Sequence, residues 1–297
     1  MLLTEEQAAP RARAVKVYPI QAADTERVAE FLHTHLNPRL TTDAWARAIA
    51  ASWGAGKPNA GFMLLHDDAV VGAHLAFYSE RDLGGGPDRV CNLGAWCVLP
   101  EHRFHALRLL RALLAQEGYS FTDLSPSGNV VPLNSRLGFD FLDTSTRLAP
   151  NLPWPRRRGR TTIAEDPAQI ARTLAGRDLR LYLDHAEAGA ARHLLLIRGD
   201  QSCYVIFRKD RRRGLPLFAS ILYASDPELL RQLARPLMCH LLLRHGVLAT
   251  LAEERIVGRW PLPSIRLRSP RPKMFKSARL EPAQVDYLYS ELVCVPW

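Results

Sequence analysis

The stretch VLPEHRFHALRLLRALL, from Val98 to Leu114, decides how this sequence folds. It begins as the end of an apolar strand, passes through a short turn rich in hydrogen-bond donors, and continues as a leucine-rich helix. A helix that begins directly after a strand directs backbone N–H groups and the positive end of its dipole outward. Arg103 and Arg108 add full charges. The junction therefore predicts a phosphate site over 103–108, with a plain turn carrying solvated arginines as the alternative.

The sequence on either side of this junction predicts a mixed sheet wound by helices. We expect strands at 15–20, 89–99 and 119–125, helices from Asp24 and Thr42, a hairpin over 61–80, and a helix or turn over 134–143 that leads into a last strand. The order β-α-α-β-β-β-α-β-α-β contains one βαβ crossover. The predicted fold class is therefore α/β (α+β), with helices flanking a mixed, mostly antiparallel sheet.

The chain is long enough for two domains of common size, since it has 297 residues, of which 47% are hydrophobic. Residues 151–160 (NLPWPRRRGR) combine prolines with a basic run, which is typical of a linker. The sequence beyond them repeats the plan of the first half more loosely. We therefore expect a mobile leader over 1–14, a first domain over 15–150, a linker over 151–160 and a divergent second domain over 161–297.

The net charge and the cysteines indicate which kinds of partner and ligand to expect. The net charge of +9 suits a phosphate-bearing partner, which can be nucleic acid, an acidic surface or a phosphorylated cofactor. The basic runs at 156–160 and 209–213 lack interleaved aromatic residues, so we expect no nucleic acid partner. The five cysteines show no close pairing, which favours free thiols over a metal site, and we expect no metal.

The sequence also lacks membrane and export signals. No apolar run approaches the roughly 18 residues that a membrane helix requires, and the first residues do not combine a basic segment with an apolar one. We therefore expect a cytoplasmic protein without a membrane partner, either monomeric or homodimeric.

The central motif resembles that of a known family. A strand, V-x-P-E-x-R, a leucine-rich helix, a second strand and N-x4-(N/Y)-x3-G-F follow one another, with matches at Val98, Pro100, Glu101, Arg103, Asn129, Asn134, Gly138 and Phe139. This pattern is similar to the acetyl-coenzyme A core of the GNAT superfamily. The resemblance covers roughly residues 15 to 148, and the second half looks like a degenerate tandem copy.

The resemblance implies that acetyl-CoA or another acyl-CoA is the co-substrate. Its pyrophosphate is expected on the turn from Arg103 to Arg108, and its pantetheine arm beside the backbone of Ala95 to Val98. The implied coenzyme A site comprises Ala95, Trp96, Cys97, Val98, Arg103, Phe104, His105, Ala106, Leu107, Arg108, Asn129 and Asn134.

Two residues depart from the family pattern. Arg108 stands where the family turn has a small residue, and it either contacts phosphate or crowds the pocket. Asn134 stands where many members carry a tyrosine that protonates the leaving thiolate. Because an amide cannot lose a proton at useful pH, that proton is expected from water or another residue. In the second half, Asp226 at the equivalent junction repels pyrophosphate, which predicts a lost cofactor site.

Acyl transfer to an amine needs a base, because an amine is mostly charged at neutral pH. The catalytic candidates are Glu80, His74 and Asp123, with Asn134 at the acid position. Each base has a structural alternative: a solvated strand end for Glu80, a satisfied core histidine for His74 and a loop cap for Asp123. The sequence favours an acyltransferase acting on an amine or hydroxyl of a small molecule or peptide. An inactive coenzyme A-binding sensor or scaffold is the alternative, and a nucleic acid binder comes third.

Overall fold

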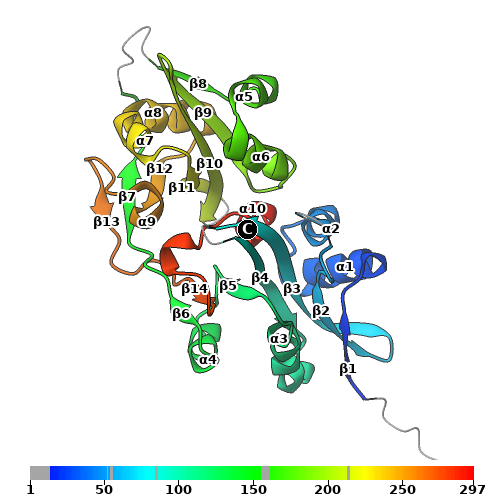
Figure 1. The fold of residues 1–297 in the computed structure, drawn as a ribbon. Helices are drawn as coiled ribbons and strands as arrows, with labels where there is room; N and C mark the ends of the chain where they lie inside the picture. The colour runs from blue at the N-terminus through cyan, green and yellow to red at the C-terminus, as the bar shows by residue number, and fades with distance from the viewer. Residues whose placement is uncertain (1–13, 52, 54–55, 84–85, 155–160, 213–214) are drawn as a thin grey trace, which may run out of the picture.

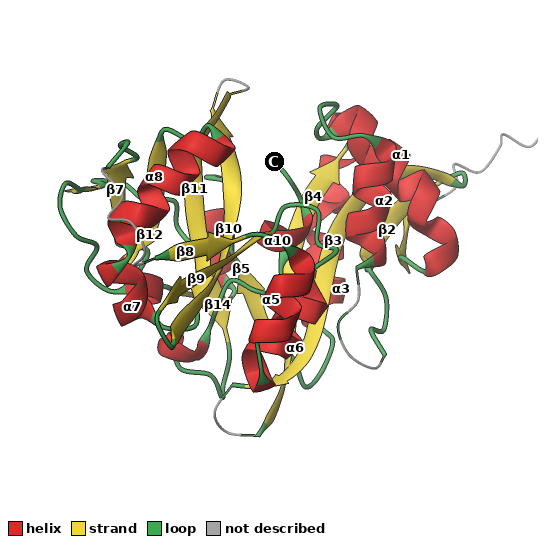
Figure 2. Cartoon of the chain, turned by 90° about the horizontal axis from the view of Figure 1, so that it is seen from above, coloured by secondary structure: helices red, strands yellow, loops and turns green. Residues whose placement is uncertain are grey.

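The computed structural model describes residues 14–51, 53, 56–83, 86–154, 161–212 and 215–297. The predicted leader lies outside this range except for residue 14, as do residues 155–160 of the predicted linker. The described chain forms two seven-stranded sheets flanked by helices, shown side by side in Figures 1 and 2. This confirms the predicted fold class.

The first sheet has the strand order β1-β2-β3-β4-β5-β14-β6. Its strands are β1 (Lys16–Pro19), β2 (Gly61–His66), β3 (Ala69–Asp82), β4 (Pro87–Val98), β5 (Ser120–Asp123), β14 (Met274–Lys276) and β6 (Asp140–Phe141). Its helices are α1 (Thr25–His35), α2 (Thr42–Ala50), α3 (Ala106–Leu114) and α4 (Val130–Arg136). Helix α3 buries Leu109, Leu110 and Leu113 on one face, which fixes its first turn at the end of β4.

The second sheet has the order β13-β7-β12-β11-β10-β9-β8. Its strands are β8 (Thr162–Ala164), β9 (Arg192–Arg198), β10 (Gln201–Arg212), β11 (Leu215–Ala224), β12 (Ala249–Glu253), β7 (Thr146–Pro150) and β13 (Ile265–Arg266). The helices of the second half are α5 (Pro167–Thr173), α6 (Gly176–His185), α7 (Pro227–Gln232), α8 (Ala234–His245), α9 (Glu254–Val257) and α10 (Glu291–Cys294).

Both sheets follow one pairing plan. In the first sheet, read from β1 to β6, every neighbouring pair is antiparallel except β4 and β5. In the second sheet, read from β8 to β13, every pair is antiparallel except β11 and β12. The second half therefore has the strand topology of the first.

The sixth position of each sheet is filled from the other half of the chain. The strand expected to complete the first sheet is β7, but it pairs with β12 over five residue pairs and with β13 on its other side. In its place, β14 pairs with β5 and β6. The expected position of this last strand is therefore wrong, because β14 buries Met274 and Phe275 there. The domain limits at 150 and 161 stay a prediction. β7 precedes both limits but belongs to the second sheet, and β14 follows them but belongs to the first.

The two halves also share a hydrophobic core. One buried cluster contains Trp45 and Phe77 from the first half together with Leu195, Tyr204 and Tyr287 from the second. Helix α10 lies between the two sheets (Figure 2). No helix within the described ranges is both long and apolar enough to cross a membrane.

Candidate functional site

The parallel strands β4 and β5 separate after four paired residues. Their pairing runs from Val90 and Ser120 to Leu93 and Asp123, where β5 ends. β4 continues to Val98, and beyond Leu93 its pairing is with β3 alone among the described strands. An unpaired strand edge presents N–H and C=O groups to an extended ligand.

A pocket of about 790 Å³ opens where the two strands separate. Its walls come from the end of α1, the free part of β4, the start of α3, the loop after β5 and the C-terminal segment. The residues that line it are Thr34, His35, Leu36, His74, Gly94, Ala95, Trp96, Cys97, Val98, Leu99, Pro100, Arg103, Ala106, Asp123, Ser125, Pro126, Ser127, Asn129, Val130, Glu291 and Trp297.

Seven of the twelve residues predicted to bind coenzyme A line this pocket. The lining residues among those predicted are Ala95, Trp96, Cys97, Val98, Arg103, Ala106 and Asn129. Phe104, His105, Leu107, Arg108 and Asn134 do not line it, and Phe104 is exposed at the surface. The structure therefore places the predicted residues of β4 in the pocket and most of the predicted turn residues outside it.

The predicted phosphate turn is a 3-10 helix, η2 (Pro100–His105). The amide of His102 donates to the carbonyl of Leu99 at 2.9 Å, and the amide of Ala106 donates to that of Arg103. This differs from the expectation of unpaired amides, because a 3-10 helix uses its N–H groups internally. The charged side chain of Arg103, by contrast, lines the pocket.

The Arg108 side chain does not enter the pocket. Its Nη1 donates to the carbonyl of Val15 at 2.8 Å and lies 3.2 Å from Nδ1 of His105. Arg108 therefore ties the start of α3 to the N-terminal end of β1. The concern that this side chain crowds the site does not apply.

Two carboxyl groups face the pocket beside the end of β5. The Asn134 amide donates to Oδ2 of Asp123 at 2.8 Å. The Ser125 hydroxyl donates to the Glu291 carboxyl, and the Glu291 backbone N–H donates to Oδ1 of Asn92 at 3.0 Å. Asn134 in α4 thus holds the Asp123 carboxyl, and Ser125 in the loop after β5 holds the Glu291 carboxyl.

Their surroundings give the carboxyl groups of Asp123 and Glu291 different pKa values. Burial raises the pKa of Asp123 to about 6, although the Asn134 hydrogen bond acts against it. Burial raises the pKa of Glu291 to about 8; the Ser125 bond opposes this rise, and the charge of Asp123 adds to it. At neutral pH, Asp123 is therefore mostly ionised while Glu291 mostly keeps its proton, as in an acid–base pair.

His74 also lines the pocket. Its ring stacks on Trp96 with centroids 4.5 Å apart and planes 1° from parallel. Burial lowers the pKa of His74 to about 3, so the imidazole is neutral, and its buried Nδ1 makes no hydrogen bond to the described residues. His74 is thus a neutral wall of the pocket rather than a satisfied core histidine.

The other two catalytic candidates lie differently. Glu80 is exposed and pairs in register with Arg89, six residues along β3 from His74, which is about 20 Å in an extended strand. It lies outside the pocket. Asn134 is fully buried behind Asp123 and donates its amide hydrogen to that carboxylate. Asn134 therefore positions Asp123.

Glu291 and Trp297 are site residues that the sequence analysis misses. Both belong to the C-terminal segment, nearly 170 residues beyond β5. One signal was present: Glu291 directly precedes the apolar run from Leu292 to Val295, and an ionisable group is rarely buried without a role.

In the second half, the equivalent strand–helix junction lies between β11 and α7, and its backbone amides bond to a carboxylate of the same turn. Asp226 accepts hydrogen bonds from the amides of Glu228 at 3.0 Å and Leu229 at 2.9 Å, as an N-cap of α7. These amides cannot serve an anion at the same time. The loss of a phosphate site that Asp226 suggests stays a prediction.

Comparison with known proteins identifies the fold. No protein-family model and no curated protein sequence matches the chain. A probable N-acyltransferase from Enterococcus faecalis V583 matches with a TM-score of 0.58 and 15% identity, covering 91% of this chain and 74% of that one. A GCN5-related N-acetyltransferase from Anabaena variabilis matches at 0.57 and 14%, covering 88% and 72%. Saccharomyces cerevisiae N-myristoyltransferase with bound myristoyl-CoA matches at 0.50 and 10%, covering 94% and 86%.

At sequence identities of 10–15%, these matches show the fold alone. The chain has a GNAT-like fold, as its central motif suggests.

Proposed function

We propose that this protein is an acyltransferase that transfers an acetyl or other acyl group from acyl-coenzyme A to an amine. The observation that carries the proposal is the free edge of β4 beside a pocket of about 790 Å³ that also holds two carboxyl groups of different proton affinity. The structures that share the fold include acyltransferases, one with myristoyl-CoA bound. A hydroxyl acceptor and a peptide acceptor belong to the same proposal.

In this proposal the donor lies along β4. The amide groups of a pantetheine arm pair with the backbone of Ala95 to Val98, as an added strand would. The Arg103 guanidinium binds the pyrophosphate, since charged hydrogen bonds to phosphate are strong and directional. Ala106 leaves room for the phosphate at the start of α3.

The two carboxyl groups handle the protons. The acceptor nitrogen attacks the thioester carbonyl, the C–S bond breaks, and the amide product forms. Ionised Asp123 accepts the proton that the amine gives up, and protonated Glu291 gives one to the departing thiolate. The pKa values that burial sets for Asp123 and Glu291 suit these roles near neutral pH.

Thioester consumption tests this function. The full chain is incubated with acetyl-CoA and with longer acyl-CoA donors, each with a panel of amines, alcohols and short peptides, and free thiol is measured. Asp123→Asn is the test variant and Glu80→Gln is the matched control, because Glu80 lies on β3 outside the pocket. Turnover that survives in Asp123→Asn would exclude Asp123 as the base.

A coenzyme A-binding sensor without turnover is the second candidate. The 3-10 helix η2 and the buried Asn134 favour it, because they remove open amides and the usual acid from the site. Calorimetry with coenzyme A separates the two: binding without thioester consumption across the whole panel supports the sensor.

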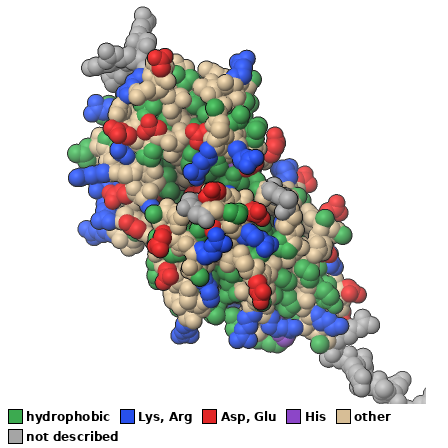
Figure 3. Space-filling model, in the orientation of Figure 1, with side chains coloured by type: hydrophobic (Ala, Val, Ile, Leu, Met, Phe, Trp, Pro, Cys, Tyr) green, Lys and Arg blue, Asp and Glu red, His purple; other side chains and the backbone are tan. Residues whose placement is uncertain are grey.

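Nucleic acid is not part of the proposal. Basic side chains are interspersed with acidic ones over both domains on the face drawn in Figure 3. A nucleic acid groove instead calls for a continuous basic track with aromatic side chains. The partner we propose is a small molecule or peptide, in a protein that acts without a membrane.

A further inference from the structure

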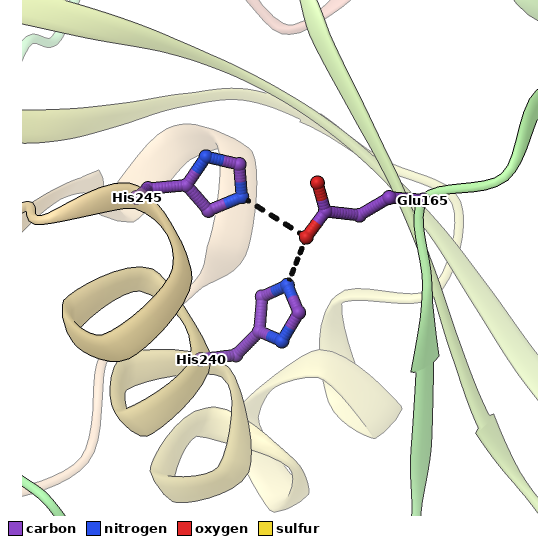
Figure 4. Close-up of side chains that lie close together, drawn as sticks. All are labelled: Glu165, His240 and His245. Atoms are coloured by element: carbon purple, nitrogen blue, oxygen red, sulfur yellow. Dashed lines mark hydrogen bonds and ion pairs between the residues drawn. The ribbon is translucent and has the colours of Figure 1, made fainter.

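A second cluster of ionisable side chains lies in the second half of the molecule. Glu165 follows β8, while His240 lies in α8 and His245 ends it. Figure 4 shows both imidazole rings turned toward the Glu165 carboxylate. None of the three lines the pocket beside β4. The acyl transfer proposed above therefore does not account for this cluster.

The two imidazoles converge on a single oxygen atom. Nε2 of His240 lies 2.5 Å from Oε1 of Glu165, and Nε2 of His245 lies 3.2 Å from the same atom. The three possible ligand atoms all lie within 4.8 Å of one another. The His245 side chain is 10% exposed, and its Nε2 is buried. This nitrogen makes no hydrogen bond of good geometry with the described residues. The contact that this nitrogen makes with Glu165 is therefore an ion pair without good hydrogen-bond alignment.

The donor set suits Zn²⁺. Imidazole nitrogen and carboxylate oxygen bind this ion at about 2.0 Å, and ligand atoms at tetrahedral angles then lie roughly 3.3 Å apart. The 3.2 Å separation from His245 already matches this value. The 2.5 Å separation from His240 has to widen by under about 1 Å, which small torsional changes in the long Glu165 side chain supply.

The end of α8 favours a cation, whereas the nearby Lys209 ammonium opposes one. His245 is the last residue of α8, and Gly246 ends the helix with φ of 65°. The C-terminal end of a helix carries partial negative charge. The nearby Lys209 ammonium donates to the backbone carbonyl of His245 at 3.3 Å, so its position is fixed by the backbone.

We propose that Glu165, His240 and His245 bind one Zn²⁺ ion. A water molecule or an external ligand completes the coordination, since the Glu165 side chain is 39% exposed and solvent reaches it. The ion joins the segment after β8 to the end of α8 and so stabilises the second half. The expectation of no metal rests on the scattered cysteines. Glu165 and His240 are 75 positions apart and form no local motif.

Zinc titration of the full chain tests the proposal. The protein is freed of any affinity tag, treated with EDTA and titrated with Zn²⁺ by calorimetry; Co²⁺ is used in parallel for its visible spectrum. We expect one Zn²⁺ per chain and tetrahedral Co²⁺ bands. At a Zn²⁺ concentration of about 100 times Kd, linkage predicts about 2.7 kcal/mol of stabilisation, and thus a rise of several degrees in Tm.

Variants of the proposed ligands test whether Zn²⁺ binds at this cluster. Glu165→Gln keeps the shape of a partly exposed side chain and should lower the affinity at least about tenfold, and His245→Gln should do the same. The matched control is the double variant His66→Gln/His102→Gln, which removes another histidine pair with rings 5.1 Å apart in the first half. This control should bind Zn²⁺ like the wild type.

The opposite pattern overturns the proposal. It fails if the wild type binds no Zn²⁺ in stoichiometric amount, or if Glu165→Gln binds as tightly as the wild type while the His66/His102 variant loses binding. Far-UV circular dichroism confirms that each variant is folded. Neither failure bears on acyl transfer, since none of these residues lines the pocket.

Discussion

Asp123 and Glu291 make the rate of the proposed reaction depend on pH in two directions. Asp123 is ionised above its pKa of about 6, and Glu291 keeps its proton below its pKa of about 8. We expect a bell-shaped profile of kcat/KM with a maximum near pH 7. Asp123→Asn should lower kcat by about 10²- to 10⁴-fold, the usual contribution of general base catalysis. A profile with neither limb in the wild type would contradict these roles.

Glu291 also links stability to pH. Burial raises the pKa of Glu291 from 4.5 to about 8 in the folded chain, so the folded state favours the protonated form. The contribution of this group to stability is therefore complete below pH 4.5 and is lost as the pH rises toward 8. Glu291→Gln, which resembles the protonated form, should match the wild type near pH 4.5 and exceed its Tm by several degrees at pH 8.5. Scanning fluorimetry at both pH values measures this, and an equal Tm at pH 8.5 would argue against a buried carboxylate.

At the scale of elements, the start of α3 tests how the pyrophosphate is bound. Arg103 lines the pocket, whereas Arg108 bonds to Val15. Arg103→Ala should weaken acetyl-CoA binding by about tenfold or more, since a hydrogen bond to a charged group contributes about 1.5–3 kcal/mol. Arg108→Ala, in the first turn of α3, is the matched control and should change the affinity by less than about threefold. Calorimetry compares the two, and the reverse order of effects would show that Arg108, not Arg103, binds the phosphate.

The elements of the first sheet were largely predictable from the sequence, because their patterns are local. Turn residues Asp67 and Asp68 adopt positive φ in the β2–β3 hairpin, and the leucines of α3 mark its buried face. β14 was not predictable, since three residues show no period and their partners lie about 150 positions away. Helix α6 was missed as well. The free edge of β4 was foreseen only through the family motif, and Glu291 reaches the pocket through long-range packing.

At the scale of the whole molecule, the exchanged strands and the shared core make the two halves interdependent. β14 joins the first sheet, β7 joins the second, and one buried cluster spans both. We expect a single cooperative unfolding transition. Phe275→Ala should cost about 3–5 kcal/mol, while Phe141→Ala, at a side chain that is 55% exposed, should cost far less. Calorimetry that resolves two independent transitions would contradict this interdependence.

Hydrogen–deuterium exchange of the full chain with and without acetyl-CoA tests most directly whether the free edge of β4 binds the donor. We expect slower exchange in peptides that cover Gly94 to Val98 when the ligand is present, and little change in the peptides of β11 and α7. Unchanged exchange along β4 at a saturating ligand concentration, or protection confined to the second half, would contradict it.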